Sequence, residues 1–121
     1  MRNKYRAKAV DGFPSQLEKA VYMLLLERER AKEISDIKRQ QTIVLQDGGK
    51  KERITWKVDF TFIHNRSGCL WLAEAKGVVT QAFSLKLRLY RRVGKHPCEI
   101  WKGNWRNPRI SEIVRPLECI E

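Results

Sequence analysis

Apolar and polar residues alternate most regularly between Ile54 and Ile63, where apolar side chains recur at every second position. Because successive side chains of a β-strand point to opposite faces, this pattern predicts a strand. Shorter runs of apolar and β-branched residues predict further strands at residues 41–46, 69–76 and 99–101. Ile34 and Ile37, which precede the first of these runs, are expected to lie in a turn that leads into it.

Two other segments have the 3.6-residue apolar period of a helix. The first begins at Ser15 and runs to about residue 32, and its apolar face consists of Leu17, Ala20, Val21, Leu24 and Leu25. Ser15 and Glu18 have the spacing of a capping box, and a helical wheel places Glu18 at the edge of the apolar face. The second helix is capped by Thr80 and ends at Gly94.

The elements follow the order α-β-β-β-α-β, which predicts an α/β domain with a mixed sheet. Three strands are expected to meander antiparallel, and the second helix returns the chain to a fourth strand parallel to the third. A chain of 121 residues suits one domain, here residues 1–121, with a basic arm at 1–12 and a C-terminal extension at 103–121. The pattern leaves open whether the helices share one face of the sheet, and whether residues 110–114 form a strand or a helix.

Two acids and a lysine meet on the predicted sheet. Glu74 and Lys76 are two residues apart and therefore share a face. Pairing Asp59 opposite Glu74 on the neighbouring strand leaves a six-residue turn at 64–69 and puts the two Cβ atoms about 4.5–5.5 Å apart, whereas a slip of one residue separates the acids. Opposed carboxylates repel unless a cation compensates them, so the pair predicts a site for Mg²⁺ or Mn²⁺. Glu18 could complete the metal shell, and Lys76 would stabilise charge at a scissile phosphate.

The net charge of +11 predicts a polyanionic partner, and nucleic acid is the commonest one for a small basic domain. Phosphate contacts are expected from the arm and from the second helix, through Arg2, Lys4, Arg6, Lys86, Arg88, Arg91 and Arg92. No apolar run approaches the roughly 20 residues that span a bilayer, so no membrane partner is expected. The cysteines are three and widely spaced, which predicts reduced thiols in a cytoplasmic protein.

Each candidate residue also has a simpler interpretation. Glu18 could only cap its helix, Asp59 could be a surface acid, and Glu74 with Lys76 could be a surface ion pair. Trp101 and Trp105 could stack on bases or belong to the core and its rim. A basic nucleic-acid-binding protein without catalysis would carry the same charge. The coincidence of Asp59, Glu74 and Lys76 within apolar strands favours the catalytic interpretation, since an unpaired charge is costly there.

These residues resemble the D…E-x-K signature of the PD-(D/E)XK nuclease superfamily, with Val58 in place of the proline. The likeness is closer to small phage and prophage proteins of that superfamily, and it covers roughly residues 1–101. The segments that carry it are Arg2-Asn3-Lys4-Tyr5, Glu18, Gln40, Asp59-Phe60-Thr61, Lys76-Gly77, Thr80, Phe83 and Lys86.

The resemblance implies a restriction-endonuclease-like core and Mg²⁺-dependent hydrolysis of DNA. Asp59 and Glu74 would bind the metal, Lys76 would be the catalytic lysine and Glu18 the helical acid, while Gln40 and Lys86 would contact the substrate. Branched DNA such as a Holliday junction would be the substrate of an intracellular homodimer, phage- or prophage-encoded in a bacterial host. The alternatives are a nicking, restriction-type or transposon-type nuclease that acts with a partner, or a non-catalytic DNA-binding protein on the same fold.

Overall fold

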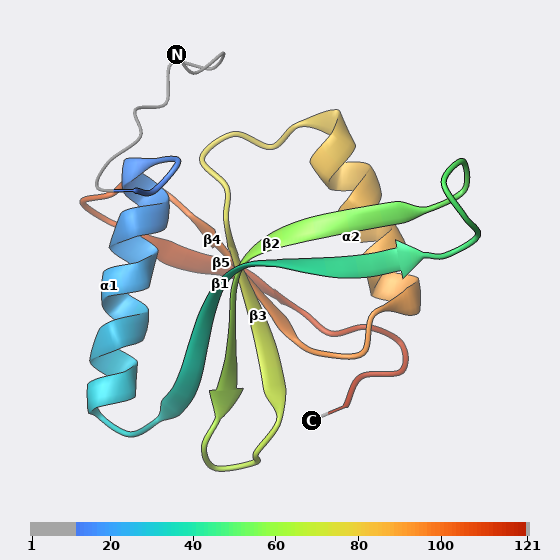
Figure 1. Cartoon of the computed structure of the whole chain (residues 1–121). Helices are drawn as coiled ribbons and strands as arrows, with labels where there is room; N and C mark the ends of the chain where they lie inside the picture. Colours follow the sequence, from blue (N-terminus) through green and yellow to red (C-terminus); the bar gives the residue numbers. More distant parts are fainter. Residues whose placement is uncertain (1–11, 121) are drawn as a thin grey trace.

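One five-stranded sheet, in the order β1-β2-β3-β4-β5, runs through the structure (Figure 1). The structure is a computed structural model that describes residues 12–120. Its strands are β1 (Ile34–Gln46), β2 (Ile54–His64), β3 (Leu70–Ala75), β4 (Cys98–Lys102) and β5 (Arg109–Val114). Its helices are α1 (Gln16–Arg30) and α2 (Gln81–Val93). Ser15 and Thr80 cap them as predicted, each side-chain oxygen accepting a backbone N–H three residues on.

The predicted mixed topology is confirmed. Strands β1, β2 and β3 are antiparallel, and β4 joins β3 in parallel after the α2 crossover. The predicted register is also confirmed, because Thr61 pairs with Leu72 and Ile63 with Leu70. Residues 109–114 form a strand antiparallel to β4, which settles the question that the sequence left open. The C-terminal extension thus completes the sheet.

The prediction for the first strand is wrong at its beginning. Residues 34–40 were expected to include a turn, but β1 begins at Ile34 and pairs with β2 from there. A register shift between Ser35 and Lys38 interrupts this pairing, and Asp36 has a φ of +55°. Pairing with the long partner strand outweighs the weak strand propensity of this charged segment, and the bulge takes up the extra residue.

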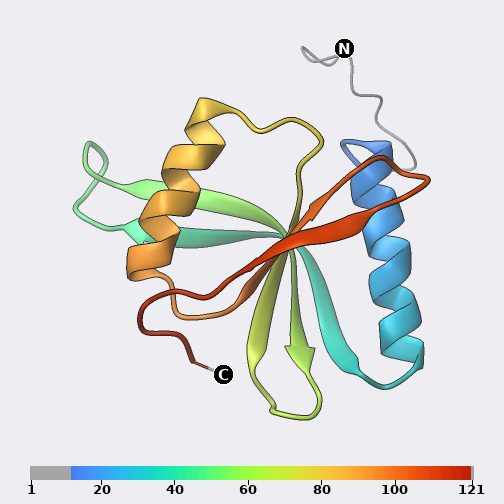
Figure 2. The same ribbon diagram turned by 180° about the vertical axis from the view of Figure 1, so that it is seen from behind.

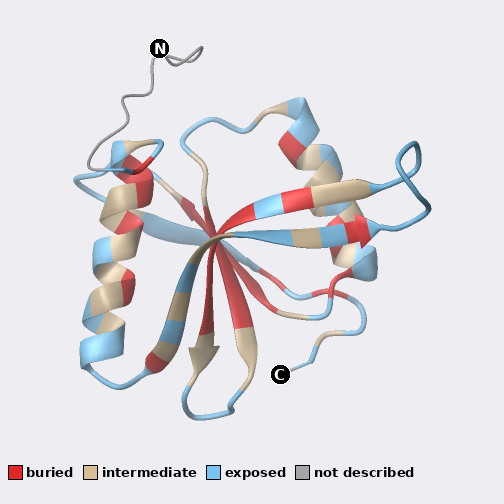
Figure 3. Ribbon diagram, viewed as in Figure 1, coloured by how far each residue is buried: buried red, intermediate tan, exposed pale blue. Residues whose placement is uncertain are grey.

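The helices cover opposite faces of the sheet, and Figure 3 shows buried residues on β2, β3 and β4 between them. Strand β3 shows the alternation directly, because Trp71 and Ala73 belong to the core under α1 while Leu72 belongs to the core under α2. The α1 core also contains Leu17, Val21, Leu25, Phe60, Phe62 and Trp101. The α2 core also contains Trp56, Val58, Phe83, Tyr90, Cys98, Ile100 and Val114.

Strands β1 and β2 turn through a large angle near their middles (Figure 1). Residues at every second position of β2 should share a face, yet Trp56 and Val58 pack under α2 whereas Phe60 and Phe62 pack under α1. The change falls at Asp59. The bend therefore carries this residue to the junction of the two cores.

Neither described helix is long and apolar enough to cross a membrane.

Candidate active site

Asp59 and Glu74 each accept a hydrogen bond from the backbone of the other's strand. One oxygen of Asp59, Oδ2, accepts a hydrogen bond from the backbone N–H of Ala75 at 2.9 Å. In return, Glu74 Oε1 accepts one from the backbone N–H of Asp59, also at 2.9 Å. Both acids are buried. The two acids that the sequence predicted to converge therefore do so, and the interpretation of Asp59 as a surface acid is wrong.

Lys76 lies beside this pair. Its Nζ atom is 3.6 Å from Glu74 Oε2 and 4.9 Å from the centre of the Phe83 ring on α2. Its backbone N–H donates to the carbonyl of Trp101, which fixes the chain just beyond β3. The lysine side chain is 30% exposed, against 4% for Glu74. The ammonium group thus connects a buried carboxylate to solvent, where a phosphate could approach.

Glu18, on α1, is connected to Asp59 through the side-chain amide of Gln40. The Nε2 atom of Gln40 donates to Glu18 Oε2 at 3.0 Å and lies 3.4 Å from Asp59 Oδ1. Gln40 has a φ of +55°, a conformation that is uncommon for a residue with a side chain and that concentrates at functional sites. Glu18 is therefore more than a capping residue. We name Glu18, Asp59 and Glu74 the carboxylate cluster.

Without a bound metal ion, Glu18 and Glu74 of the carboxylate cluster favour their protonated forms. Burial, followed by repulsion from Asp59, raises the pKa of Glu18 and of Glu74 to about 8. Lys76 opposes the rise for Glu74, and the Gln40 hydrogen bond with the charge of Arg39 opposes it for Glu18. Neither effect cancels burial. A divalent cation would be expected to displace these protons.

In the absence of divalent ions, the free energy of unfolding should fall as the pH rises from about 5 to about 8. Glu18 and Glu74 have an ordinary pKa of 4.5 and a folded pKa of about 8. Between these values the folded protein binds more protons than the unfolded chain, so stability declines with rising pH and levels off above about 8. Urea unfolding in EDTA at three pH values measures this slope. Glu74→Gln should flatten it, and an equal slope in both proteins would contradict the assignment.

The cluster fits a magnesium-type ion with few protein ligands. Among residues 12–120, no three His, Cys, Asp or Glu side chains are grouped closely enough to hold a metal. Mg²⁺ commonly binds through one or two carboxylates and keeps water or phosphate oxygens as its other ligands. Asp59 and Glu74 provide such a pair, because both are buried and each is oriented by a hydrogen bond from a backbone N–H. Glu18 as a third ligand stays a prediction.

The predicted DNA contacts are spread along α2. Phe83, near the start of α2, contacts the ammonium of Lys76. Lys86 and Arg88 lie within the next two turns of the helix. Arg92, nine residues beyond Phe83, is about 13 Å farther along the axis. Arg91 donates to Glu112 at 2.7 Å and is therefore engaged within the protein. The arm residues Arg2, Lys4 and Arg6 lie outside the described residues.

A second buried charge, which the sequence pattern did not predict, lies under α1. Both carboxylate oxygens of Glu99 accept hydrogen bonds from Arg28 Nη1 at 3.1 Å, and Trp101 Nε1 donates to the same group at 3.1 Å. Burial raises the pKa of Glu99, and Arg28 opposes this rise. The signal was present, since Glu99 interrupts an apolar strand. Trp101 belongs to the core, whereas Trp105 is exposed.

Comparison with known proteins places the chain in a family. Residues 2–117 match a family described as a protein of unknown function, DUF1064. The chain belongs to the DUF1064 family. Neither curated proteins nor solved structures give a match. A functional interpretation of this DUF1064 protein therefore rests on the geometry of the carboxylate cluster with Lys76, and on the resemblance in sequence.

Proposed function

We propose that the protein is a metal-dependent endodeoxyribonuclease that hydrolyses phosphodiester bonds of branched DNA, such as Holliday junctions or flaps. The observation that carries the proposal is the reciprocal hydrogen bonding of Asp59 and Glu74, with Lys76 Nζ 3.6 Å from Glu74. Two buried carboxylates and an accessible ammonium suit the hydrolysis of a phosphate diester with a divalent cation. The net charge of +11 suits a DNA substrate.

Asp59 and Glu74 would hold Mg²⁺ or Mn²⁺. The bound ion would supply a Lewis acid for the phosphoryl group and lower the pKa of a water molecule. The hydrogen bonds from backbone N–H groups orient both carboxylates before substrate arrives. Gln40 lies between Asp59 and Glu18, so it would keep Asp59 in place, rather than contact DNA directly. This role differs from the DNA contact that the resemblance implied.

Lys76 would act on the substrate itself. Negative charge grows on the phosphate oxygens in the transition state, and a preformed cation stabilises it without further reorganisation. The Lys76 ammonium lies 4.9 Å from the centre of the Phe83 ring, and the partial exposure of the side chain leaves it within reach of a phosphate. Lys86, one turn beyond Phe83 on α2, would contact the flanking backbone, whereas Arg88 lies on the other side of the helix.

Cutting both strands of a junction requires two sites, which a twofold homodimer supplies. The proposed enzyme is therefore a homodimer. The size of the domain favours recognition of DNA shape over a long base sequence. A nicking or restriction-type enzyme with a partner protein remains the alternative within the same chemistry.

The proposal predicts which labelled DNA the wild-type protein cuts. Four-way and flap substrates should be cleaved in Mg²⁺ or Mn²⁺, linear duplex much more slowly, and none of them in EDTA. Gel electrophoresis of the products measures the rate and the position of each cut. Cleavage that is equal for all substrates would contradict selectivity for branches. Tight binding without cutting would favour the non-catalytic alternative.

A further inference from the structure

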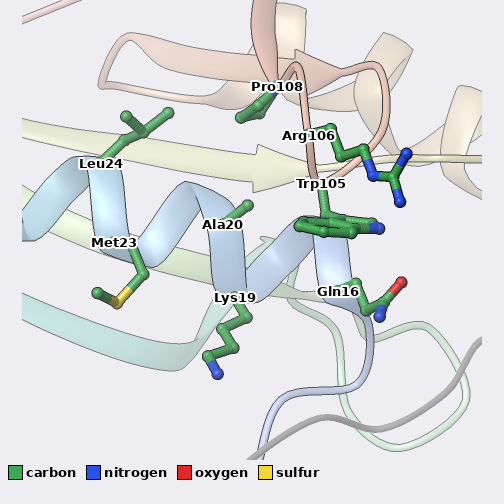
Figure 4. A pocket seen from close by; sticks show the side chains of 8 residues that line it. All are labelled: Gln16, Lys19, Ala20, Met23, Leu24, Trp105, Arg106 and Pro108. Atoms are coloured by element: carbon green, nitrogen blue, oxygen red, sulfur yellow. The ribbon is translucent and has the colours of Figure 1, made fainter.

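A hollow of about 600 Å³ lies between α1 and the loop that joins β4 to β5 (Figure 4). Ala20, Met23 and Leu24 of α1 line it from one side, and Pro108 lines it from the loop. At 100° per residue, these α1 residues occupy a different face of the helix from Glu18. Figure 2 also shows the β4–β5 loop beside α1. The hollow is thus a second feature, separate from the carboxylate cluster.

Trp105 makes this hollow unusual. Its side chain is 47% exposed, whereas the chain's other three tryptophans are each at most 8% exposed. In Figure 4 the indole extends from the loop toward Gln16 at the start of α1. The guanidinium of Arg106 lies over one face of this ring, with its central carbon 5.0 Å from the ring centre. An exposed indole beside a guanidinium is the combination on which unpaired bases stack.

The charged residues that line the hollow indicate what kind of molecule binds in it. Arg106 and Lys19 both line the hollow, in a protein with a net charge of +11, so the site is complementary to a polyanion. A nucleic acid strand carries the phosphates for these cations and a flat apolar base for the indole and its aliphatic neighbours. The side-chain amide of Gln16 could hydrogen-bond to the edge of such a base.

We infer that the hollow receives an unpaired base of a single-stranded DNA segment, stacked on Trp105. The inference deepens the proposed function, on which it rests. Gln16 and Lys19 bracket Glu18 on α1, and a helix with its side chains is about 10–12 Å across. The stacked base would therefore lie at least one helix diameter from the cut phosphate, on a strand that passes around α1. The preferred substrate therefore has an unpaired strand beside the cleavage site, as a flap does.

The test is tryptophan fluorescence in EDTA, with single-stranded and duplex oligonucleotides as probes. Among the four tryptophans only Trp105 is exposed. Single-stranded DNA should therefore quench the part of the tryptophan emission that comes from Trp105, and duplex DNA should quench it much less. Trp105→Ala should remove this quenching and weaken single-strand binding by roughly tenfold or more, as stacking on one aromatic side chain implies. Trp105→Phe should retain part of the affinity. Leu85→Ala, at another exposed apolar residue, is the matched control and should bind as wild type does.

Unchanged single-strand affinity in Trp105→Ala would overturn the inference. So would emission that shifts with rising protein concentration while single strands lose the ability to quench it, because a second copy of the chain would then occupy the hollow. These measurements require no cleavage, so they separate the two proposals. Cleavage by wild type with no role for Trp105 would contradict only the inference. Stacking on Trp105 in a protein that cuts no DNA would contradict only the nuclease.

Discussion

Replacing Lys76 with alanine should slow DNA cleavage by about 10²–10³-fold, the usual cost of losing one preformed group that stabilises transition-state charge. At about pH 6 and without metal, the free energy of unfolding should change little, because burial raises the pKa of Glu74 to about 8 and the protonated carboxyl group then needs no cation. Single-turnover cleavage of a flap substrate at saturating Mg²⁺ measures the chemical step. DNA affinity, measured in EDTA, should fall much less than the rate.

Two further variants make the Lys76 result specific. Lys76→Arg retains the positive charge and should recover part of the rate. Lys50→Ala removes a lysine from the turn between β1 and β2, away from the carboxylate cluster, and should cleave at the wild-type rate. A wild-type rate in Lys76→Ala would exclude a role for this ammonium group in the reaction.

Replacing Arg28 with methionine should reduce the free energy of unfolding by about 3 kcal/mol, because the substitution leaves Glu99 buried without its partner. The Glu99 side chain is 3% exposed, and both of its carboxylate oxygens accept hydrogen bonds from Arg28. Burial already raises the pKa of Glu99. Protonation relieves an unpaired buried carboxylate, so the loss should be larger at about pH 8 than at about pH 5. Urea unfolding at both pH values measures it.

Arg30→Met is the matched control, since Arg30 is exposed at the end of the same helix. Its effect should stay within about 0.5 kcal/mol, as for most surface substitutions. The double variant Arg28→Met with Glu99→Gln should recover part of the stability by removing the buried charge. Equal losses for Arg28→Met and Arg30→Met would mean that the Arg28–Glu99 pair does not hold α1 to the sheet.

The sequence predicted the elements whose pattern is local. The alternation in β2 and the apolar period of α2 identify these elements without reference to the rest of the chain, and Thr80 and Gly94 mark the ends of α2. The predicted register of β2 against β3 leaves a six-residue turn between them, and the structure has this register. Because register decides which side chains face each other, the meeting of Asp59 with Glu74 was predictable as well.

Other features depend on contacts between distant segments, which a local pattern does not contain. The first part of β1 is charged and becomes a strand only by pairing with β2. The left-handed conformation of Gln40 turns its amide to the acids, and no residue type at that position signals it. The hollow under Trp105 needs α1 and the β4–β5 loop together. Residues 1–11, which carry part of the predicted DNA surface, lie outside the described structure.

Cleavage by Asp59→Asn tests whether the Asp59 carboxylate is needed for metal-dependent hydrolysis. Asparagine keeps the shape of the side chain but removes the charge that would bind the metal, so the variant should fold and bind DNA. We expect wild type to cut four-way or flap DNA in Mg²⁺ and the variant to leave the same DNA uncut under identical conditions. Equal, metal-independent cutting by both proteins, or no cutting by wild type on any of these substrates in Mg²⁺ or Mn²⁺, would contradict the account.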